Sequence, residues 1–433
     1  MKKLLLLILI LKLTSSFAQI LTAEEAIKLA LQNNFDIQLA RNSADVAANN
    51  NSLGNAGMLP QVNANGALGG SNTALNQTLA DGRNTERNGV ITNTANAGVQ
   101  LSWTLFDGMG MFINRTRLNQ LNAAGEQAYR IQVEQTLQEV LTAYYNLVRQ
   151  QYVVKVNEQN LKLSDERVRL AGNRYEVGTG SKLDYLQSKV DRNNDKTLLI
   201  QLQQALETSK IQLNQLLARE VRTTFKVADS LEVDSTLSYD NLFKDAQIKN
   251  SVLKLTDLQR SVALQDLRLV RAQQMPSLNF NSGYTYNRSK TTAGFLLLNQ
   301  NNGLNFGLNA SVPLFAGFNM KRQYQNAKLN LRSAELLNQK QQLEVQAQLN
   351  TVYVQYSRNK ELLALQRENV VTAKLAMEVA MDKFRIGTAN LLEVKNAQQN
   401  LLNSENRMIE VILQIKQSEV QLLRLSGNLV KGN

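Results

Sequence analysis

The chain is 433 residues long and carries 48 basic against 36 acidic residues, a formal net charge of +12. It contains no cysteine and no histidine, which excludes disulfides, thiolate metal sites and the commonest general base of enzymes. The basic residues are interspersed with acids, Asn and Gln and never form a run of five like charges, which argues against nucleic acid as a partner.

Residues 1–18 have the pattern of a secretory signal peptide. Lys2 and Lys3 precede an apolar run from Leu4 to Leu13, and small residues lead to a cleavage position after Ala18. The apolar run is too short to span a membrane, and no later segment reaches the roughly 20 apolar residues that a transmembrane helix needs. We therefore expect an exported protein whose mature chain contains no membrane helix.

The mature chain is expected to begin with one helix that leads into a pair of strands. Thr22 is a suitable N-cap, and helical spacing of apolar residues continues nearly to Pro60, which ends the helix. Apolar and polar residues then alternate over about 61–68 and again over about 97–106. This alternation predicts two strands separated by a polar loop over 69–96.

A long coiled-coil helix is expected from Gly110 to Gly178. The segment contains no proline, and an apolar residue recurs at every seventh position: Val140, Leu147, Val154, Leu161, Val168 and Tyr175. At about 1.5 Å per residue such a helix extends on the order of 100 Å, farther than a compact domain requires.

The residue pattern that ends this helix returns 209 positions later. Both copies close on Gly-Thr: Arg174, Gly178 and Thr179 in the first, and Lys383, Gly387 and Thr388 in the second. The heptad series returns with the same offset, as Leu349, Tyr356, Leu363, Val370, Met377 and Phe384. We interpret the chain as a duplication in which each Gly-Thr forms the tip of a helical hairpin, near residues 178 and 387.

The duplication divides the chain into two structural repeats, 19–217 and 241–433, with a connector over 218–240. In the second repeat, alternation over about 277–287 and 304–314 predicts two further strands around a polar loop over 288–303. The predicted fold is therefore mostly α with a β-barrel portion, in which helix, strand, strand and helical hairpin occur twice.

The four predicted strands suit an outer-membrane barrel. They are about ten residues long, with apolar residues on one face and Asn, Ser, Thr or Gly on the other. Trp103, Tyr284 and Tyr286 lie where an aromatic girdle at the lipid boundary is expected. The alternative is a soluble antiparallel sheet with one wet face. Because a small closed barrel takes at least about eight strands, a membrane barrel must pool strands from several subunits.

In the order of these features the chain resembles the TolC-like outer membrane efflux proteins. The resemblance covers nearly the whole mature chain and rests on the helix Ala26 to Ile37 leading to Leu59-Pro60, the strand exit Trp103 to Gly108, its counterpart Pro313 to Gly317, and the two tips. It implies a homotrimer that forms a twelve-stranded barrel in outer membrane lipid, continued by a helical tunnel across the periplasm of a Gram-negative bacterium. It also implies that the tips dock to a periplasmic adaptor protein and an inner-membrane transporter. Many relatives carry a lipidated cysteine, which this chain lacks.

Two acids occupy equivalent positions beyond the tips. Asp184 and Glu393 each lie six residues past a tip glycine, so a trimer would place six acids at one level. The resemblance implies that helices converge here and that the acids line a cation-favouring constriction, with Gln187 and Asn396 one turn farther on. The alternative is that both acids are solvated surface residues.

No residue pattern indicates catalysis, a cofactor or a metal. The glycine clusters do not lie between a buried strand and a helix with a following Lys-Ser/Thr, as a phosphate loop requires. One hypothesis is the outer membrane channel of a tripartite efflux or type I secretion system, a passive duct for small toxic molecules or polypeptides. The other is a structural or adhesive coiled-coil protein anchored by a barrel, without transport. The duplication favours the duct, because an anchor needs only one set of strands.

Overall fold

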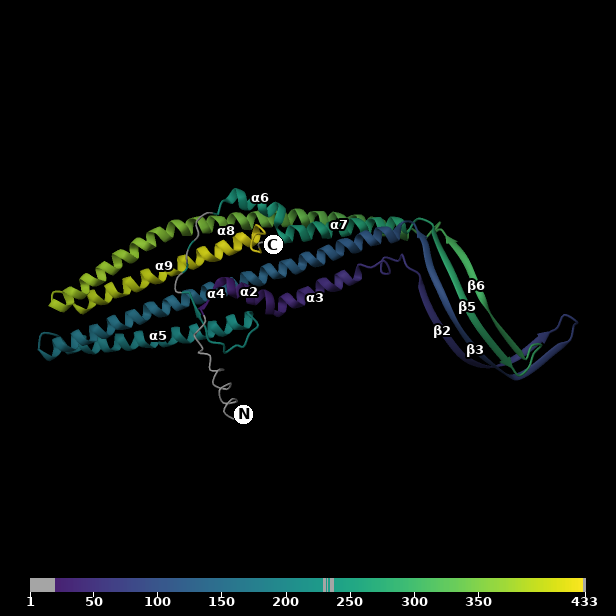
Figure 1. Cartoon of the computed structure of the whole chain (residues 1–433), viewed down its shortest axis with the longest axis horizontal. Helices are drawn as coiled ribbons and strands as arrows, with labels where there is room; N and C mark the ends of the chain where they lie inside the picture. Colours follow the sequence, from purple (N-terminus) through teal and green to yellow (C-terminus); the bar gives the residue numbers. More distant parts are fainter. Residues whose placement is uncertain (1–19, 229–230, 232, 234–236, 431–433) are drawn as a thin grey trace, which may run out of the picture. The chain divides into compact units, whose positions relative to one another are not determined.

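The computed structural model describes residues 20–228, 231, 233 and 237–430, so the predicted signal peptide at 1–18 lies outside the described residues (Figure 1). These residues form two compact units. The first comprises the described parts of Met1–Asn42, Gln127–Lys254 and Lys340–Asn433, and the second comprises Ser43–Glu126 and Leu255–Gln339. Each unit takes segments from both halves of the chain, and the division into repeats at 218–240 stays a prediction.

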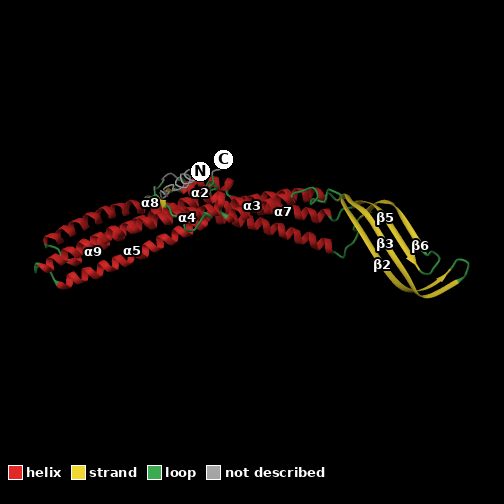
Figure 2. Ribbon diagram, turned by 60° about the horizontal axis from the view of Figure 1, so that its bottom comes forward, coloured by secondary structure: helices red, strands yellow, loops and turns green. Residues whose placement is uncertain are grey.

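Two pairs of long helices dominate the chain. Their bounds are α4 Gly110–Glu176, α5 Lys182–Leu216, α8 Asn319–Ile386 and α9 Leu391–Leu425. In both views each pair forms an antiparallel hairpin (Figures 1 and 2), as predicted for the two Gly-Thr tips. Within the described residues, no helix is both long enough and apolar enough to cross a membrane.

The heptad residues form much of the helical core. Val140, Leu147 and Leu349 are fully buried. Each fully buried aliphatic side chain contributes about 1.5–3 kcal/mol through removal of apolar area from water. The coiled-coil interpretation of these helices is therefore consistent with their packing.

The single N-terminal helix expected from the sequence is instead two helices, α2 (Ala23–Asn33) and α3 (Phe35–Asn50). Asn34 leaves the helical conformation, with φ −60° and ψ 130°. Its Oδ1 accepts hydrogen bonds from the backbone N–H groups of Asp36 and Ile37, and its Nδ2 donates to the Leu216 carbonyl at 2.8 Å. The Asn34 side chain thus caps the start of α3 and the end of α5, whose last residue is Leu216.

The same interruption occurs in the second half. Helices α6 (Tyr239–Lys249) and α7 (Ser251–Ala272) flank Asn250. The Oδ1 of Asn250 accepts from the N–H groups of Val252 and Leu253, and its Nδ2 donates to the Leu425 carbonyl at 2.8 Å.

A small parallel sheet, which was not predicted from the sequence, lies in the first unit. Strand β1 (Ile20–Leu21) pairs with β4 (Lys226–Val227), which belongs to the connector. Leu21 and Val227 join the core of α4, where the Tyr144 hydroxyl donates to the Leu21 carbonyl at 3.1 Å.

The second unit contains a four-stranded antiparallel sheet in the order β2-β3-β5-β6 (Figure 2). Its strands are β2 Gln61–Thr78, β3 Asn84–Asp107, β5 Ser277–Thr291 and β6 Leu298–Ser311. The strands begin or end near the predicted positions but are mostly longer. The polar loops expected over 69–96 and 288–303 are mostly strand, because a run of Thr, Asn and Gly can pair its backbone without apolar alternation.

The register gives this sheet one apolar and one polar face. Val99 lies opposite Ala64 and Tyr284, and Tyr284 lies opposite Leu304. Directly opposite residues share a face, so apolar residues of all four strands lie together. Asn, Ser, Thr and Gly of the neighbouring positions form the other face. The observed alternation agrees with the one predicted for the barrel strands.

Candidate functional site at the hairpin tips

Both hairpins turn at a glycine in the left-handed region. Gly178 has φ 75° and Gly387 has φ 89°, a conformation that glycine adopts without a steric penalty. The Arg174 carbonyl accepts from the N–H groups of Thr179 and Gly180 at 2.9 and 2.8 Å. The Lys383 carbonyl accepts from Thr388 and Ala389 at 2.9 and 3.2 Å.

The threonine hydroxyls complete the two turns. The Oγ1 of Thr179 donates to the Arg174 carbonyl at 3.3 Å, and the Oγ1 of Thr388 donates to the Lys383 carbonyl at 3.2 Å. The six predicted tip residues thus form two turns of the same construction. The turn hydrogen bonds alone account for the two Gly-Thr pairs. The role of these residues in docking an adaptor stays a prediction.

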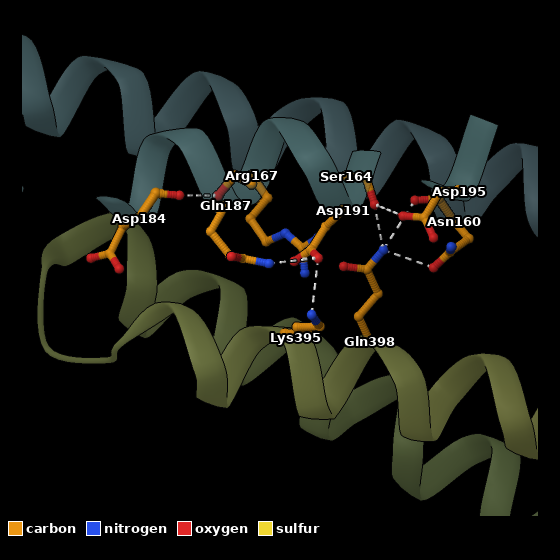
Figure 3. Close-up of polar contacts among 10 residues, drawn as sticks. Asn160, Ser164, Arg167, Asp184, Gln187, Asp191, Asp195, Lys395 and Gln398 are labelled. Atoms are coloured by element: carbon orange, nitrogen blue, oxygen red, sulfur yellow. Dashed lines mark hydrogen bonds and ion pairs between the residues drawn. The ribbon is translucent and has the colours of Figure 1, made fainter. Parts of the chain in front are cut away.

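The helices that follow the tips are capped by side chains, and each has an acid in its first turn. Ser181 Oγ accepts from the Leu183 N–H at 3.1 Å, and Asn390 Oδ1 accepts from the Glu393 N–H at 2.9 Å. Asp184 and Glu393 are exposed, and within the described part of the chain neither carboxylate forms a hydrogen bond or ion pair. Figure 3 shows Asp184 turned away from the neighbouring polar side chains. A first-turn position also suits the helix dipole, so both interpretations of these acids stay open.

The four residues predicted for the constriction do not form one cluster. Gln187 donates through Nε2 to Asp191 Oδ1 at 3.3 Å, whereas Asn396 is exposed on α9. Gln187 therefore belongs to a different set of polar side chains, which lies farther from the tip.

That group connects the two hairpins around Asp191, which is 8% exposed. Lys395 of α9 donates to Asp191 at 2.9 Å, and Arg167 of α4 lies 3.5 Å away (Figure 3). Arg167 is 2% exposed. Burial lowers the pKa of Arg167, and the charges of Asp191 and Asp195 oppose that shift. Removing one partner of such a buried pair leaves an uncompensated charge and is strongly destabilising.

A second set of hydrogen bonds lies about one helical turn farther from the tip. Gln398 donates through Nε2 to the Asn160 Oδ1 at 2.7 Å and to the Ser164 Oγ at 2.8 Å. Ser164 in turn donates to Asp195 at 2.5 Å. We refer to the residues around Asp191 and Gln398 as the inter-hairpin polar cluster: Asn160, Ser164, Arg167, Gln187, Asp191, Asp195, Lys395 and Gln398.

Sequence reasoning missed the inter-hairpin polar cluster. The available signal was the interruption of the apolar series of α5 at Arg192, beside Ser188, Asp191 and Asp195 at helical spacing. Polar residues at core positions of a coiled coil specify register at a cost in stability. The cluster fits that role between the two hairpins.

Apolar packing joins the hairpins closer to the tips. The Arg174 guanidinium lies 5.1 Å from the centre of the Phe384 ring, within the range of a cation–π contact. Tyr175, by contrast, stacks on Tyr185 of its own hairpin. Around Phe384 lies a small core made by Leu170, Ala171, Met377, Met381, Ala389, Leu391 and Val394.

The three predicted girdle residues share the apolar face of the sheet. Trp103 lies opposite Phe280, and Tyr286 follows six residues farther along β5, a separation of about 20 Å. The Trp103 indole donates to the Met58 carbonyl at 3.1 Å, while Tyr284 accepts from Asn302 at 2.6 Å. The aromatic residues thus lie at two levels of the apolar face, and their place in a membrane girdle stays a prediction.

No group of three or more acidic side chains in the described ranges is arranged to hold a metal ion.

A sequence profile of the family described as outer membrane efflux protein matches residues 26–219 and 242–428. The chain belongs to the outer membrane efflux protein family. The resemblance to TolC-like proteins drawn from the sequence is confirmed.

Individual relatives support the same family assignment. The chain is 21% identical over 419 residues to outer membrane efflux protein BepC of Brucella suis biovar 1, covering 96% of this chain and 88% of that protein. It is 22% identical over 334 residues to outer membrane protein TolC of Escherichia coli K12, covering 75% and 67%. Both relatives carry names that place them in the outer membrane.

Solved structures show the same fold. The outer membrane protein VceC of Vibrio cholerae has a TM-score of 0.77 at 17% identity, with 94% of this chain and 96% of that chain covered. The Campylobacter jejuni CmeC outer membrane channel has a TM-score of 0.79 at 17% identity, with 94% and 86% covered. The mostly helical fold of this chain is therefore shared with these two outer membrane proteins.

Proposed function

We propose that this protein is the outer membrane channel of a tripartite efflux or type I secretion system. It acts as a passive duct through which small toxic molecules or polypeptides leave the cell. Family membership supports the outer membrane location. The observation that carries the proposal is the sheet of the second unit, which has an exposed apolar face and two edges, β2 and β6, that no described strand pairs.

The open edges favour assembly into a trimer. Unpaired backbone groups cannot be satisfied in lipid, so an open sheet must close before it can span a membrane. Since each pairing within the sheet is antiparallel, β6 of one copy can continue antiparallel to β2 of the next. Three copies then close a twelve-stranded barrel, an even number of strands as such barrels have.

The long helices support the same assembly. Large apolar side chains of α5 and α8 remain exposed in a single copy, among them Leu183, Val190, Ile200, Leu343, Val354, Val371 and Leu375. Further copies covering them would extend the barrel into a helical wall across the periplasm.

Two features of the tips belong to this proposal. Asp184 and Glu393 have free carboxylates in equivalent first turns, which supports a cation-favouring constriction at the periplasmic end. Arg174, Gly178, Thr179, Lys383, Gly387 and Thr388 form the adjoining turns, on which we place the docking of a periplasmic adaptor. The adaptor links the duct to an inner-membrane transporter.

Efflux of small molecules has support from relatives. The toluene efflux pump outer membrane protein TtgC of Pseudomonas putida is 24% identical to this chain over 417 residues. A barrel-anchored adhesive protein, the other hypothesis, has no comparable support.

Deletion of the gene tests the proposal. We expect the deletion strain to become more sensitive to several apolar toxicants, or to retain a polypeptide that the parent secretes. A plasmid copy of the wild-type gene should restore the parental behaviour. An unchanged toxicant panel and secretome, together with loss of surface adhesion, would favour the structural alternative.

A further inference from the structure

The proposed trimer contains two kinds of seam between the halves of the chain. Inside one copy, β3 of the first half pairs with β5 of the second half, and we call this junction the inner seam. Between copies, the free edge β6 would pair with the free edge β2 of the next copy, and we call this junction the outer seam. Helices α4 and α7 adjoin the strands of the inner seam, whereas α8 and α3 adjoin those of the outer seam.

Two sequence offsets relate the seams. Subtracting 34 from 250 for Asn34 and Asn250, and 60 from 276 for Pro60 and Pro276, gives 216 for the segments that lead into the sheet. The segments that lead out of the sheet have the offset of the hairpin tips, 209 positions. Each contact across the inner seam therefore specifies one pair of residues across the outer seam.

The first such contact lies at the end of β3. Gly108 has φ 68°, and a Cβ at this position would overlap the Cβ of Met275 and the carbonyl oxygen of Ala272. The equivalent Gly317 has φ 57°, but apart from its chain neighbours no described atom lies within 4 Å of the position of its Cβ. Leu59, which corresponds to Met275, is exposed. The close contact of the inner seam is thus open in the outer seam of a single copy.

Polar contacts join α4 to α7 farther along the inner seam. Arg117 Nε donates to Asp266 at 2.5 Å, and Ser251 Oγ donates to Glu134 at 2.6 Å. Each contact lies within one of the two units. Higher residue numbers in α4 meet lower numbers in α7, so the helices are antiparallel in a defined register.

The outer seam has apolar residues at the positions of the buried polar pair. Ser251 is 1% exposed and Glu134 is 4% exposed. Their counterparts are Phe35, which is 68% exposed, and Leu343, which is 67% exposed. A phenylalanine and a leucine thus remain in water where the inner seam has a buried hydrogen bond.

A further pair lies between these positions and the sheet. Val46 of α3 and Leu329 of α8 are both exposed. Their counterparts in the inner seam, Val262 and Gln120, each lie one helical turn beyond the ion pair of that seam and are therefore level with each other. Both counterparts are only partly exposed.

We propose that α3 of one copy packs antiparallel against α8 of the next copy, in the register that α7 and α4 have within the chain. The facing pairs, with the residue of the next copy second, are Phe35 and Leu343, Val46 and Leu329, and Leu59 and Gly317. A second copy fits this face because pairing of the edges β6 and β2 brings the two helices to the same seam. The inference rests on the proposed function, because it requires the trimer.

The chemistry of the seams also selects the correct partner. Phe35 opposite Leu343 removes apolar surface of both side chains from water. Phe35 opposite Glu134, or Ser251 opposite Leu343, would instead leave a buried polar group without its hydrogen-bond partner, which is costly. The apolar outer seam and the polar inner seam therefore do not interchange.

Cysteine cross-linking of the full-length protein tests the register. The chain contains no cysteine, so two introduced cysteines report on one pair without background. On oxidation, Val46→Cys with Leu329→Cys, and likewise Phe35→Cys with Leu343→Cys, should form a covalent trimer on a non-reducing gel. The swapped combinations, Val46→Cys with Leu343→Cys and Phe35→Cys with Leu329→Cys, use the same four positions.

The helix geometry sets the expected difference. Leu329 and Leu343 lie about 21 Å apart along α8, beyond the reach of a disulfide. The matched combinations should therefore give at least about fivefold more covalent trimer than the swapped ones.

A transplanted pair tests the chemistry of the seam. Leu343→Glu places a carboxylate opposite Phe35 and should lower the fraction of trimer counted by native mass spectrometry. Adding Phe35→Ser recreates the pair of Ser251 and Glu134 and should restore most of the trimer. Adding Val46→Ser instead also removes an apolar side chain from α3, but it should not restore the trimer.

Two outcomes would overturn the outer seam: equal cross-linking of the matched and swapped combinations, and equal restoration by Val46→Ser and Phe35→Ser. Conductance in planar bilayers and the native mass of the wild type are measured in parallel. A conducting trimer whose matched cysteines stay unlinked refutes the helix register alone. Absence of both trimer and conductance refutes the proposed channel.

Discussion

At the scale of single residues, Asn34 and Asn250 have equivalent roles in the two halves. Each ends one helix, caps the next, and donates to the last-turn carbonyl of a long helix, Leu216 or Leu425. These two carbonyls are 209 positions apart, the offset of the hairpin tips. An asparagine is well suited to this position because its amide carries both an acceptor and a donor.

The acids beyond the tips can be tested at the same scale. Asp184→Asn with Glu393→Gln should lower the cation selectivity of the channel in planar bilayers and weaken its block by multivalent cations, because acids that face a narrow pore concentrate cations. Glu176→Gln with Asp382→Asn removes the same charge near the tips and serves as the control. Unchanged selectivity and block in the first variant would show that Asp184 and Glu393 lie on the outer surface and do not face the pore.

At the scale of elements, the sheet presents its two faces to different surroundings. Leu308 is opposite Phe280 on the apolar face and is 65% exposed in a single copy. Its neighbour Asn309 points to the polar face, opposite Asn279. If the apolar face meets lipid, the two positions must respond differently to a charge.

Arginine substitutions at these neighbours measure that difference. Leu308→Arg should cost about 1 kcal/mol, the smaller penalty near an interface, because Leu308 lies in register with Phe280 and Trp103 at the predicted lipid boundary, whereas Asn309→Arg should fold normally and alter conductance. The free energy of unfolding in lipid vesicles, measured by denaturant titration, distinguishes them. Equal tolerance of the two substitutions would contradict the assignment of the faces.

At the scale of the whole molecule, the proposed duct requires the β-hairpin turns to reach the cell exterior and the helical tips to lie in the periplasm. The chain contains no cysteine, so single cysteines can report on each end without background. Ala80 lies in the turn between β2 and β3, and Val177 and Ile386 are highly exposed at the two tips.

We expect a membrane-impermeant maleimide to label Ala80→Cys on intact cells. Val177→Cys and Ile386→Cys should react only after the outer membrane is permeabilised, because both would lie behind it. Labelling is followed by gel shift of the protein. Reaction of the tip cysteines on intact cells at the rate of Ala80→Cys would contradict the topology.

The sequence by itself determined the long helices, the tips and the approximate positions of the strands. Heptad spacing and strict alternation are local properties that depend only on which side of a helix or strand is buried. Gly178 and Gly387 mark the tips because their left-handed φ favours glycine. The order of these local signals also sufficed to indicate the family.

Only the tertiary structure decided the features that depend on distant partners. Asn34 breaks a helix because its amide reaches a carbonyl 182 residues away, and Lys395 meets Asp191 across 204 residues. The full length of the strands follows from backbone pairing, which polar side chains do not reveal. Pairing likewise brings Gly70, Asn93 and Lys290 to neighbouring positions of three strands. Local patterns report which face of an element is buried, whereas a contact between elements depends on geometry that no single segment contains.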